Sequence, residues 1–336
     1  MELTGKRILV IGGAGLIGSH TVDQLLKEDV KEIRIFDNFT RGSEENLELA
    51  LKDPRVTIFS HGGELMHPEL VRAGMQDIDG IFHFAAMWLL HCWDYPRSAF
   101  DVNLGGLFNV LEAITLNPQV QRLVWSSSAS VYGDAIEEPM TEDHPLNNTN
   151  FYGATKVAGE QFCRSFYHRH KDSSSAFDYV GLRYMNVYGS RQDYQGAYIA
   201  VIMKMLDNID KGVAPVVYGD GSQAYDFVNV IDCARANVCA MKAESTDEFY
   251  NVGTGIRTSI KELAELVLDI TGSDLKIKYE PAGQTFVKNR IGCPEKAKRE
   301  IGFDASISLR EGLKALIDWR DSHKEQVLRR QRAAAK

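Results

Sequence analysis

The stretch that most constrains the fold is a glycine-rich turn at residues 8–20, ILVIGGAGLIGSH. Gly12, Gly15 and Gly18 stand three residues apart, between an apolar run typical of a buried strand and a helical pattern that opens with Leu16 and Ile17. Glycines at such a turn permit a sharp bend, a close approach of the backbone to a pyrophosphate, and close packing of helix on strand. The free N–H groups at the start of the helix favour phosphate. We therefore predict that these five residues bind a dinucleotide.

Short β-branched runs alternate with helical patterns along the first half of the chain. The apolar runs fall at residues 7–13, 33–38, 56–63, 80–86 and 122–128. Helical patterns separate several of them, as at 16–28 and 99–116. Strand–helix–strand repetition of this kind predicts a parallel sheet with helices on both faces. The expected fold class is therefore α/β, a Rossmann doubly wound parallel sheet.

The pattern loosens after residue 180, where glycine, proline and tyrosine become frequent. We expect strands at 181–189 and 249–253, and an amphipathic helix at 259–272 that ends at Gly272. These elements predict a smaller C-terminal α/β lobe that binds the substrate. The expected domains are a dinucleotide-binding Rossmann domain at 1–182 to which 222–250 returns, a substrate-binding lobe at 183–221 and 251–325, and a tail at 326–336.

Composition narrows the partners and the compartment. A net charge of −8 and a pI near 5.6 argue against a nucleic-acid-binding protein. The longest apolar stretch, residues 80–93, is too short to span a bilayer, and the chain opens with no charged-then-apolar leader, so we expect a cytoplasmic protein with no membrane contact. Five scattered cysteines without a CxxC pair fit reduced thiols, and we expect no metal.

The strand at 33–38 ends in an acid, Asp37, followed by Asn38. A carboxylate at the end of the second strand can accept hydrogen bonds from both hydroxyls of an adenosine ribose, and it repels a 2′-phosphate. Taken alone, Asp37 is more typical of a turn cap. Together with the glycine turn, it predicts NAD as the cofactor.

The chemistry is expected where the strand at 122–128 ends in three serines, since ligands bind at the carboxyl edge of such sheets. Further along, Tyr152 and Lys156 stand four residues apart, about one helical turn. Such a pair alone is more typical of a helix surface. After the glycine turn, Asp37 and the serines, it predicts a Tyr152 phenol whose pKa the Lys156 ammonium and the nicotinamide lower. Tyr152 then removes a substrate hydroxyl proton while Ser128 holds the substrate and Lys156 holds the nicotinamide ribose.

Nearly the whole chain resembles the extended short-chain dehydrogenases/reductases, and among them the NAD-dependent nucleotide-sugar epimerases and dehydratases. The motifs GGAGLIGSH, FDN, GGEL, HFAA, SSSASVYG, YGATK, LRYMNVYG, VVYGDG and NVGTG follow in the family order. The resemblance implies further NAD contacts at Glu64, Leu65, Phe84, Ala85, Ala86, Asn103, Ser126, Tyr184 and Val187. It implies substrate contacts at Met87, Trp88, Asn186, Val217 and Tyr218, and a homodimer formed by the helices at 101–113 and 152–167.

The residues after the serine strand indicate which reaction the chain catalyses. Relatives that remove water carry an Asp–Glu pair there, and decarboxylating relatives keep a Glu, whereas this chain has Ser128-Ala129-Ser130. We therefore expect a 4-epimerase acting on a UDP-hexose or UDP-N-acetylhexosamine. A nucleotide-sugar dehydratase or dehydrogenase with the same three catalytic residues is the alternative, and a non-catalytic NAD-binding sensor is a more remote one.

The substrate half departs from the family pattern at two places. Tyr225 stands where relatives have an arginine that clamps the diphosphate, and Gly283 or Gln284 stands where a second arginine is expected. Arginine is well suited to hold phosphate oxygens, so we expect Arg290, Lys288 or Arg191 as a substitute, and a Tyr225 that binds a phosphate or stacks. The alternative is a substrate other than an ordinary UDP-hexose. The bulky Trp88 either narrows the sugar pocket or fills the core.

Overall fold

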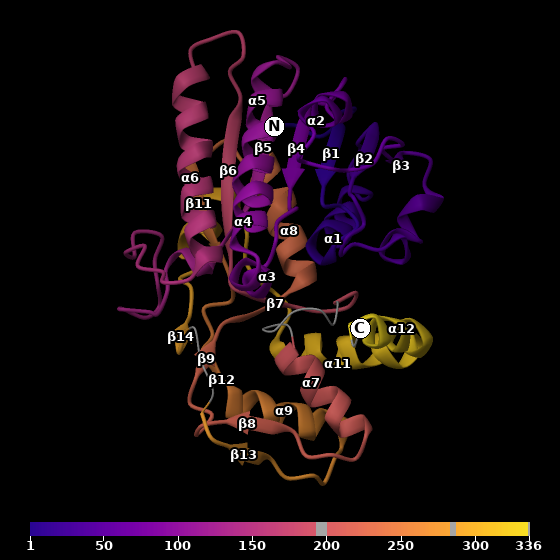
Figure 1. Cartoon of the computed structure of the whole chain (residues 1–336), viewed down its shortest axis with the longest axis vertical. Helices are drawn as coiled ribbons and strands as arrows, with labels where there is room; N and C mark the ends of the chain where they lie inside the picture. Colours follow the sequence, from indigo (N-terminus) through magenta and orange to yellow (C-terminus); the bar gives the residue numbers. More distant parts are fainter. Residues whose placement is uncertain (193–199, 283–286, 335–336) are drawn as a thin grey trace.

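The structure, a computed structural model, describes residues 1–192, 200–282 and 287–334 (Figure 1). Its centre is a seven-stranded parallel sheet in the order β11-β6-β5-β4-β1-β2-β3. The strands are β1 (Arg7–Ile11), β2 (Glu32–Phe36), β3 (Val56–Ile58), β4 (Gly80–His83), β5 (Arg122–Ser128), β6 (Asp178–Tyr184) and β11 (Glu248–Val252). The predicted α/β doubly wound fold is confirmed, because all seven strands run parallel and helices cover both faces.

Alternating side chains of each strand build a separate core on each face of the sheet. Ile8 and Val10 of β1 belong to one core, whereas Leu9 and Ile11 belong to the other. The first core packs against α1 (Leu16–Leu25) and α8 (Val230–Lys242), and the second against α2 (Pro68–Gly74), α5 (Gly106–Thr115) and α6 (Phe151–His170). Figure 1 shows α5 and α6 side by side in front of the sheet.

Two segments differ from the expected elements. The helix expected at 99–116 is divided into α4 (Pro96–Phe100), a π-helical turn at Asp101–Gly105, and α5. The strand expected at 181–189 is divided at Met185, because β6 stays in the main sheet while β7 (Asn186–Tyr188) pairs with β10 (Phe227–Asn229). The chain therefore leaves the main sheet at Met185 and enters the second half of the molecule.

A smaller group of elements lies below the sheet in Figure 1 and has a core of its own. Its helices are α7 (Ala200–Asp210), α9 (Ile260–Thr271) and α11 (Leu309–Ser322). Its short strands are β8 (Val216–Tyr218), β9 (Ala224–Tyr225), β12 (Thr258–Ser259), β13 (Lys278–Glu280) and β14 (Asn289–Arg290). The helix expected at 259–272 is confirmed: Ser259 and Glu262 form a capping box, and Gly272 ends it with a φ of 62°.

The remaining helices are α3 (Leu89–Asp94), α10 (Glu295–Ile301) and α12 (Lys324–Ala334). Because β11 pairs with β6, the chain returns to the main sheet after β9 and α8. The domain limits given above remain a prediction. Within the described ranges, no helix is both long and apolar enough to cross a membrane.

Candidate active site

The glycine turn leaves no room for side chains. A Cβ on Gly18 would lie 2.1 Å from the carbonyl oxygen of Gly12, and one on Gly12 would lie 2.7 Å from the backbone nitrogen of Ala85. Gly12 also has a φ of 78°, which L side chains rarely adopt. Helix α1 therefore packs directly on the end of β1, and its first turn lines a cavity.

Asp37, at the end of β2, is held rigidly beside the glycine turn. Its Oδ2 accepts a hydrogen bond from the Ala14 N–H at 2.9 Å, and its Oδ1 accepts one from the Phe39 N–H at 2.8 Å. Burial nevertheless raises the pKa of this carboxyl, against both of these hydrogen bonds. Each oxygen keeps a lone pair that can accept a ribose hydroxyl.

A cavity of about 1220 Å³ runs from the glycine turn, past the tips of β4 and β5, to the smaller lobe. Almost all the residues that the sequence singles out lie on its wall. They are Gly12, Gly15, Leu16, Ile17, Gly18, Asp37, Asn38, Glu64, Leu65, Phe84, Ala85, Ala86, Met87, Trp88, Ser126, Ser128, Tyr152, Lys156, Tyr184, Asn186, Val187, Tyr218, Tyr225 and Arg290. Residues from both halves of the chain thus meet around one space.

Two expected contacts are not on that wall. Val217 is fully buried in the core of the smaller lobe, because alternate residues of β8 face opposite ways and its neighbours Val216 and Tyr218 line the cavity instead. Asn103 lies behind the wall: its Oδ1 accepts from the Met87 N–H at 2.6 Å, and its Nδ2 donates to Met87 O at 3.1 Å. Asn103 therefore fixes the backbone of a wall residue.

Helix α6 brings the proposed catalytic side chains to the tip of β5. Asn150 caps the helix by accepting a hydrogen bond from the Gly153 N–H, and Tyr152 and Lys156 then lie one turn apart. The Lys156 ammonium donates to the Ser126 carbonyl at 2.6 Å and lies 5.7 Å from the centre of the Tyr152 ring. Ser128 lines the cavity together with Tyr152. The serine strand and the helix thus share one polar junction.

The expected lowering of the Tyr152 pKa is not found among the protein's own charges. Burial raises the pKa of this phenol to about 12, and the Cys92 thiol adds to the rise. The Ser128 hydroxyl and the guanidiniums of Arg41 and Arg290 lower the pKa by less. Burial also lowers the pKa of Lys156, to about 8. In the protein without NAD, desolvation outweighs the nearby charges, and a lowering of the pKa by the nicotinamide stays a prediction.

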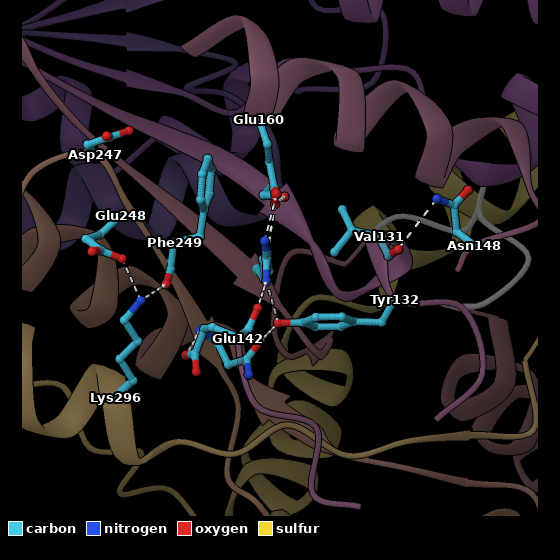
Figure 2. Close-up of polar contacts among 12 residues, drawn as sticks. Val131, Tyr132, Glu142, Asn148, Glu160, Asp247, Glu248, Phe249 and Lys296 are labelled. Carbon is cyan, nitrogen blue, oxygen red and sulfur yellow. Dashed lines mark hydrogen bonds and ion pairs between the residues drawn. The ribbon is translucent and has the colours of Figure 1, made fainter. Parts of the chain in front are cut away.

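Glu160, one turn beyond Lys156, anchors α6 to the sheet (Figure 2). Its carboxylate accepts hydrogen bonds from the Ser127 hydroxyl at 2.6 Å and from Nε and Nη2 of Arg183 at 2.8 and 2.7 Å. Arg183 Nη1 donates to the Tyr132 hydroxyl at 2.8 Å and to the Glu142 carbonyl at 2.9 Å. Ser127 stands between Ser126 and Ser128, so this buried ion pair holds the serine strand beside the helix.

On the substrate side, the Tyr225 hydroxyl donates to the Val287 carbonyl at 2.8 Å. Arg290 pairs with Tyr225 in the β9–β14 register and lines the cavity with it. Asn186 lines the same part, and its buried Nδ2 has no hydrogen-bond partner among the residues that the structure describes. Gly283 and Gln284, the other expected departure, lie outside the described residues.

The aromatic segment after β4 is divided between cavity and surface. Trp88 lines the cavity, and the Arg41 guanidinium lies 4.1 Å from the centre of its ring. His91 packs edge-on against Trp88 with ring centres 4.8 Å apart. Trp93 is 57% exposed and lies off the cavity wall. Trp88 therefore lies at the cavity wall, and its role as a residue that narrows the sugar pocket stays a prediction.

The sequence analysis did not predict several residues of the cavity wall. Arg41, Gly42 and Ser43 directly follow the Asp37 strand end, and that position in the loop is the signal that could have identified them. Lys204 and Gln223 come from weakly patterned segments and carry no such signal. Within residues 1–192, 200–282 and 287–334, no group of three or more His, Cys, Asp or Glu side chains is arranged to hold a metal ion.

Comparison with known proteins places this geometry in a family. The model of the NAD dependent epimerase/dehydratase family matches residues 8–253, most of the chain. The chain belongs to this family. Its members use NAD, and the cradle fits that cofactor: the glycine turn offers bare backbone for a pyrophosphate, and Asp37 faces the ribose position. NAD is therefore the cofactor, as the sequence predicted.

Individual relatives of this epimerase/dehydratase family member are similar over nearly their full length. A putative UDP-glucose 4-epimerase of Methanocaldococcus jannaschii is 32% identical, over 93% of this chain and 97% of that protein. The solved UDP-N-acetylglucosamine 4-epimerase of Methanobrevibacter ruminantium, in complex with UDP-N-acetylmuramic acid, is 30% identical with a TM-score of 0.87, over 95% and 99% of the chains. The dTDP-glucose 4,6-dehydratase DesIV of Streptomyces venezuelae is 26% identical with a TM-score of 0.87, over 96% and 99%.

The pKa of Lys156 predicts a pH dependence of stability. Between the folded value of about 8 and the ordinary 10.5, the unfolded chain holds a proton that the folded chain lacks. The free energy of unfolding should therefore rise with pH across this window, and Lys156→Met should remove that component. Urea unfolding at a series of pH values measures it. Lys261→Met, at a side chain 52% exposed, should keep the wild-type slope; equal slopes in all three proteins would contradict the prediction.

Glu160→Gln should destabilise the protein by about 3–5 kcal/mol, because it leaves the Arg183 guanidinium buried without its counter-charge. Chemical unfolding at neutral pH measures the loss. Glu265→Gln, on the exposed face of α9 with Lys261 3.9 Å away, is the matched control and should change stability by at most about 0.5 kcal/mol. A loss of the same small size in both variants would show that the buried pair contributes little.

Proposed function

We propose that this protein is an NAD-dependent nucleotide-sugar 4-epimerase. The observation that carries the proposal is the wall around Tyr152, where Ser128, Ser130 and Lys156 line the cavity. The acids among the described lining residues are Asp37, Glu45 and Glu64, which all lie near the adenosine end. Elimination of water from a sugar needs a positioned acid and base besides the tyrosine, whereas epimerisation at C4 does not. The wall therefore favours epimerisation.

The glycine turn and Asp37 would hold NAD, which would supply hydride acceptance from C4 of the sugar and its return to the opposite face. Tyr152 takes the proton of the C4 hydroxyl and gives it back, and the Ser128 hydroxyl holds the same oxygen. Lys156, held by the Ser126 carbonyl at 2.6 Å, keeps a positive charge behind the phenol. Because the phenol alone has a pKa of about 12, its deprotonation depends on positive charge that arrives with the ligands.

UDP is the proposed nucleotide, because the similar epimerases from M. jannaschii and M. ruminantium are named for UDP-sugars. Tyr218, Asn186 and Tyr225 are the proposed contacts of the nucleotide half, together with Arg290. The Tyr225 hydroxyl is engaged by the Val287 carbonyl, so its ring rather than its hydroxyl faces the ligand.

A cytoplasmic location belongs to the same proposal, since all five cysteines are free, as in a reducing compartment.

A homodimer through α5 and α6 is also proposed. Phe108 on α5 is 43% exposed, and its ring centre lies 6.2 Å from that of Phe162 and 5.3 Å from that of Phe166 on α6. An apolar patch that joins two long helices is typical of a protein–protein contact. A second copy of the same helices is the proposed partner, consistent with the paired symmetry of most oligomers.

Tyr152→Phe should lower turnover by about 100- to 10,000-fold and leave bound NAD in place, because it removes only the proton-transfer group. The assay is NMR of a panel of UDP-sugars incubated in D2O. Interconverted C4 epimers without solvent deuterium are the expected products of the wild type. Deuterium at C5 with loss of the C6 hydroxyl would instead identify a dehydratase, and Tyr152→Phe with unchanged behaviour in every assay would identify a sensor.

Phe108→Glu should convert the dimer to a monomer, since it places a charge in the proposed apolar contact. Sedimentation velocity at micromolar concentration measures the change. Tyr279→Glu, on β13 and 48% exposed, is the control and should remain dimeric. A wild-type protein that sediments as a monomer would overturn the proposed assembly.

A further inference from the structure

Two segments that are far apart in the sequence meet at the cavity in a single side-chain contact. The Arg41 guanidinium lies 4.1 Å from the centre of the Trp88 ring. Arg41 belongs to the loop that follows β2, Trp88 belongs to the segment that follows β4, and both residues line the cavity. A guanidinium over the face of an indole is attracted by the electrons of the ring. The contact therefore links the two segments to each other.

The order of the strands places this contact at the glycine turn. In the sheet, β1 lies between β4 and β2 (Figure 1). All three strands run parallel, so the segments after β4 and β2 leave the sheet on either side of the turn that follows β1. In such a fold the pyrophosphate of a dinucleotide lies at this turn. A contact between the two flanking segments therefore spans the part of the cavity that takes the pyrophosphate.

The loop that carries Arg41 is fixed on the glycine turn itself. The Ala14 carbonyl accepts hydrogen bonds from the Ser43 N–H at 3.2 Å and from Nδ2 of Asn46 at 2.7 Å. A Cβ on Gly42 would lie 2.7 Å from the Cβ of Ala14, so the two backbones are in close contact. Arg41 precedes Gly42 directly. Its side chain therefore starts from a fixed point beside the phosphate position.

Trp88 is supported from the opposite side. Its carbonyl accepts a hydrogen bond from the Cys92 N–H at 2.9 Å, in the first turn of α3. The His91 ring packs edge-on against the indole with ring centres 4.8 Å apart, and Tyr95 packs edge-on against His91 at 6.2 Å. The preceding residue, Met87, is held by Asn103. The indole is therefore held at the cavity by the helix behind it.

The indole N–H of Trp88 is buried and has no acceptor among the residues that the structure describes. A buried donor without an acceptor is unfavourable. Closure of the Arg41–Trp88 contact is therefore incomplete in the protein alone. A ligand that brings an acceptor, or a movement of the ring toward water, would complete it. NAD offers phosphate and ribose oxygens as acceptors, and its negative pyrophosphate suits a nearby guanidinium.

We propose that Arg41 and Trp88 form a clasp that closes over NAD and slows its release. The contact has to open before a dinucleotide at the glycine turn can leave on that side. Slow release is an advantage for an enzyme that regenerates NAD within each turnover, because the reduced form must not exchange before it returns the hydride. The inference goes beyond the proposed function, since it concerns the cofactor and holds for any sugar substrate.

The test measures the release of NAD without any sugar present. The protein is loaded with isotopically labelled NAD, an excess of unlabelled NAD is added, and the label that remains bound is followed after rapid desalting. The variants are Arg41→Ala, Trp88→Ala, Trp88→Phe and the double variant Arg41→Ala with Trp88→Ala. Trp93→Ala is the control, because Trp93 is 57% exposed and lies off the cavity wall.

Arg41→Ala and Trp88→Ala should each raise the rate of NAD dissociation by about 5- to 30-fold, the size expected for a partly desolvated cation–π contact. The double variant should show clearly less than the product of the two single increases, because each change removes the same contact. Trp88→Phe keeps an aromatic face and should be slower than Trp88→Ala. Trp93→Ala should release NAD like the wild type.

Several outcomes overturn the inference. Unchanged release in both single variants would show that the contact does not retain NAD, and a double variant equal to the product would show that the two residues act separately. Trp88→Phe as fast as Trp88→Ala would exclude a role for the ring face. Equal wild-type affinity for NADP and NAD, with loss of NADP alone in Arg41→Ala, would assign Arg41 to a 2′-phosphate. If Trp88→Ala does not fold, Trp88→Phe with Arg41→Ala provides the same cycle.

Discussion

The ion pair between Glu160 and Arg183 is the interaction on which the rest of the site depends. It is almost fully buried, with side-chain exposures of 1% and 6%, and it joins α6 to β6. The same carboxylate accepts the Ser127 hydroxyl of β5, so three elements meet at one charged group. Buried charges are costly unless they are paired and hydrogen-bonded, and Arg183 adds hydrogen bonds to the Tyr132 hydroxyl and the Glu142 carbonyl.

Because of this junction, the geometry of the reacting groups comes from secondary structure rather than from loops. Tyr152, Lys156 and Glu160 follow one another at helical spacing, so anchoring the last residue orients the first two. The Lys156 ammonium is then bound by the carbonyl of Ser126, on the strand that Glu160 holds. The contacts that orient the proposed catalytic residues are therefore also contacts that stabilise the fold.

The sequence predicted the fold and most of the cavity wall because periodic signals carry both. Glycine spacing, strand ends and a four-residue spacing are local, and parallel topology brings them to one sheet edge. Val217 was predicted to line the cavity, but it lies in the core of the smaller lobe. Side chains alternate between the two faces of a short strand, and the sequence does not show which face meets the core. The pKa of Tyr152 was misjudged because it depends on burial, a property of the whole fold. The contact between Glu160 and Arg183 could not be predicted, because Arg183 is far from Glu160 in the sequence. The pairing of β5 with β6 brings the two residues together.

The hydrogen bond from Tyr225 to the Val287 carbonyl has a consequence for transferring specificity between proteins of this kind. Tyr225 lies on the cavity wall and braces the segment that leads into the strand of Arg290. One wall residue thus supports the position of another. Introducing Arg290 alone into a protein without the tyrosine would add the positive charge but not the strand position that orients it. The two residues therefore have to be exchanged together.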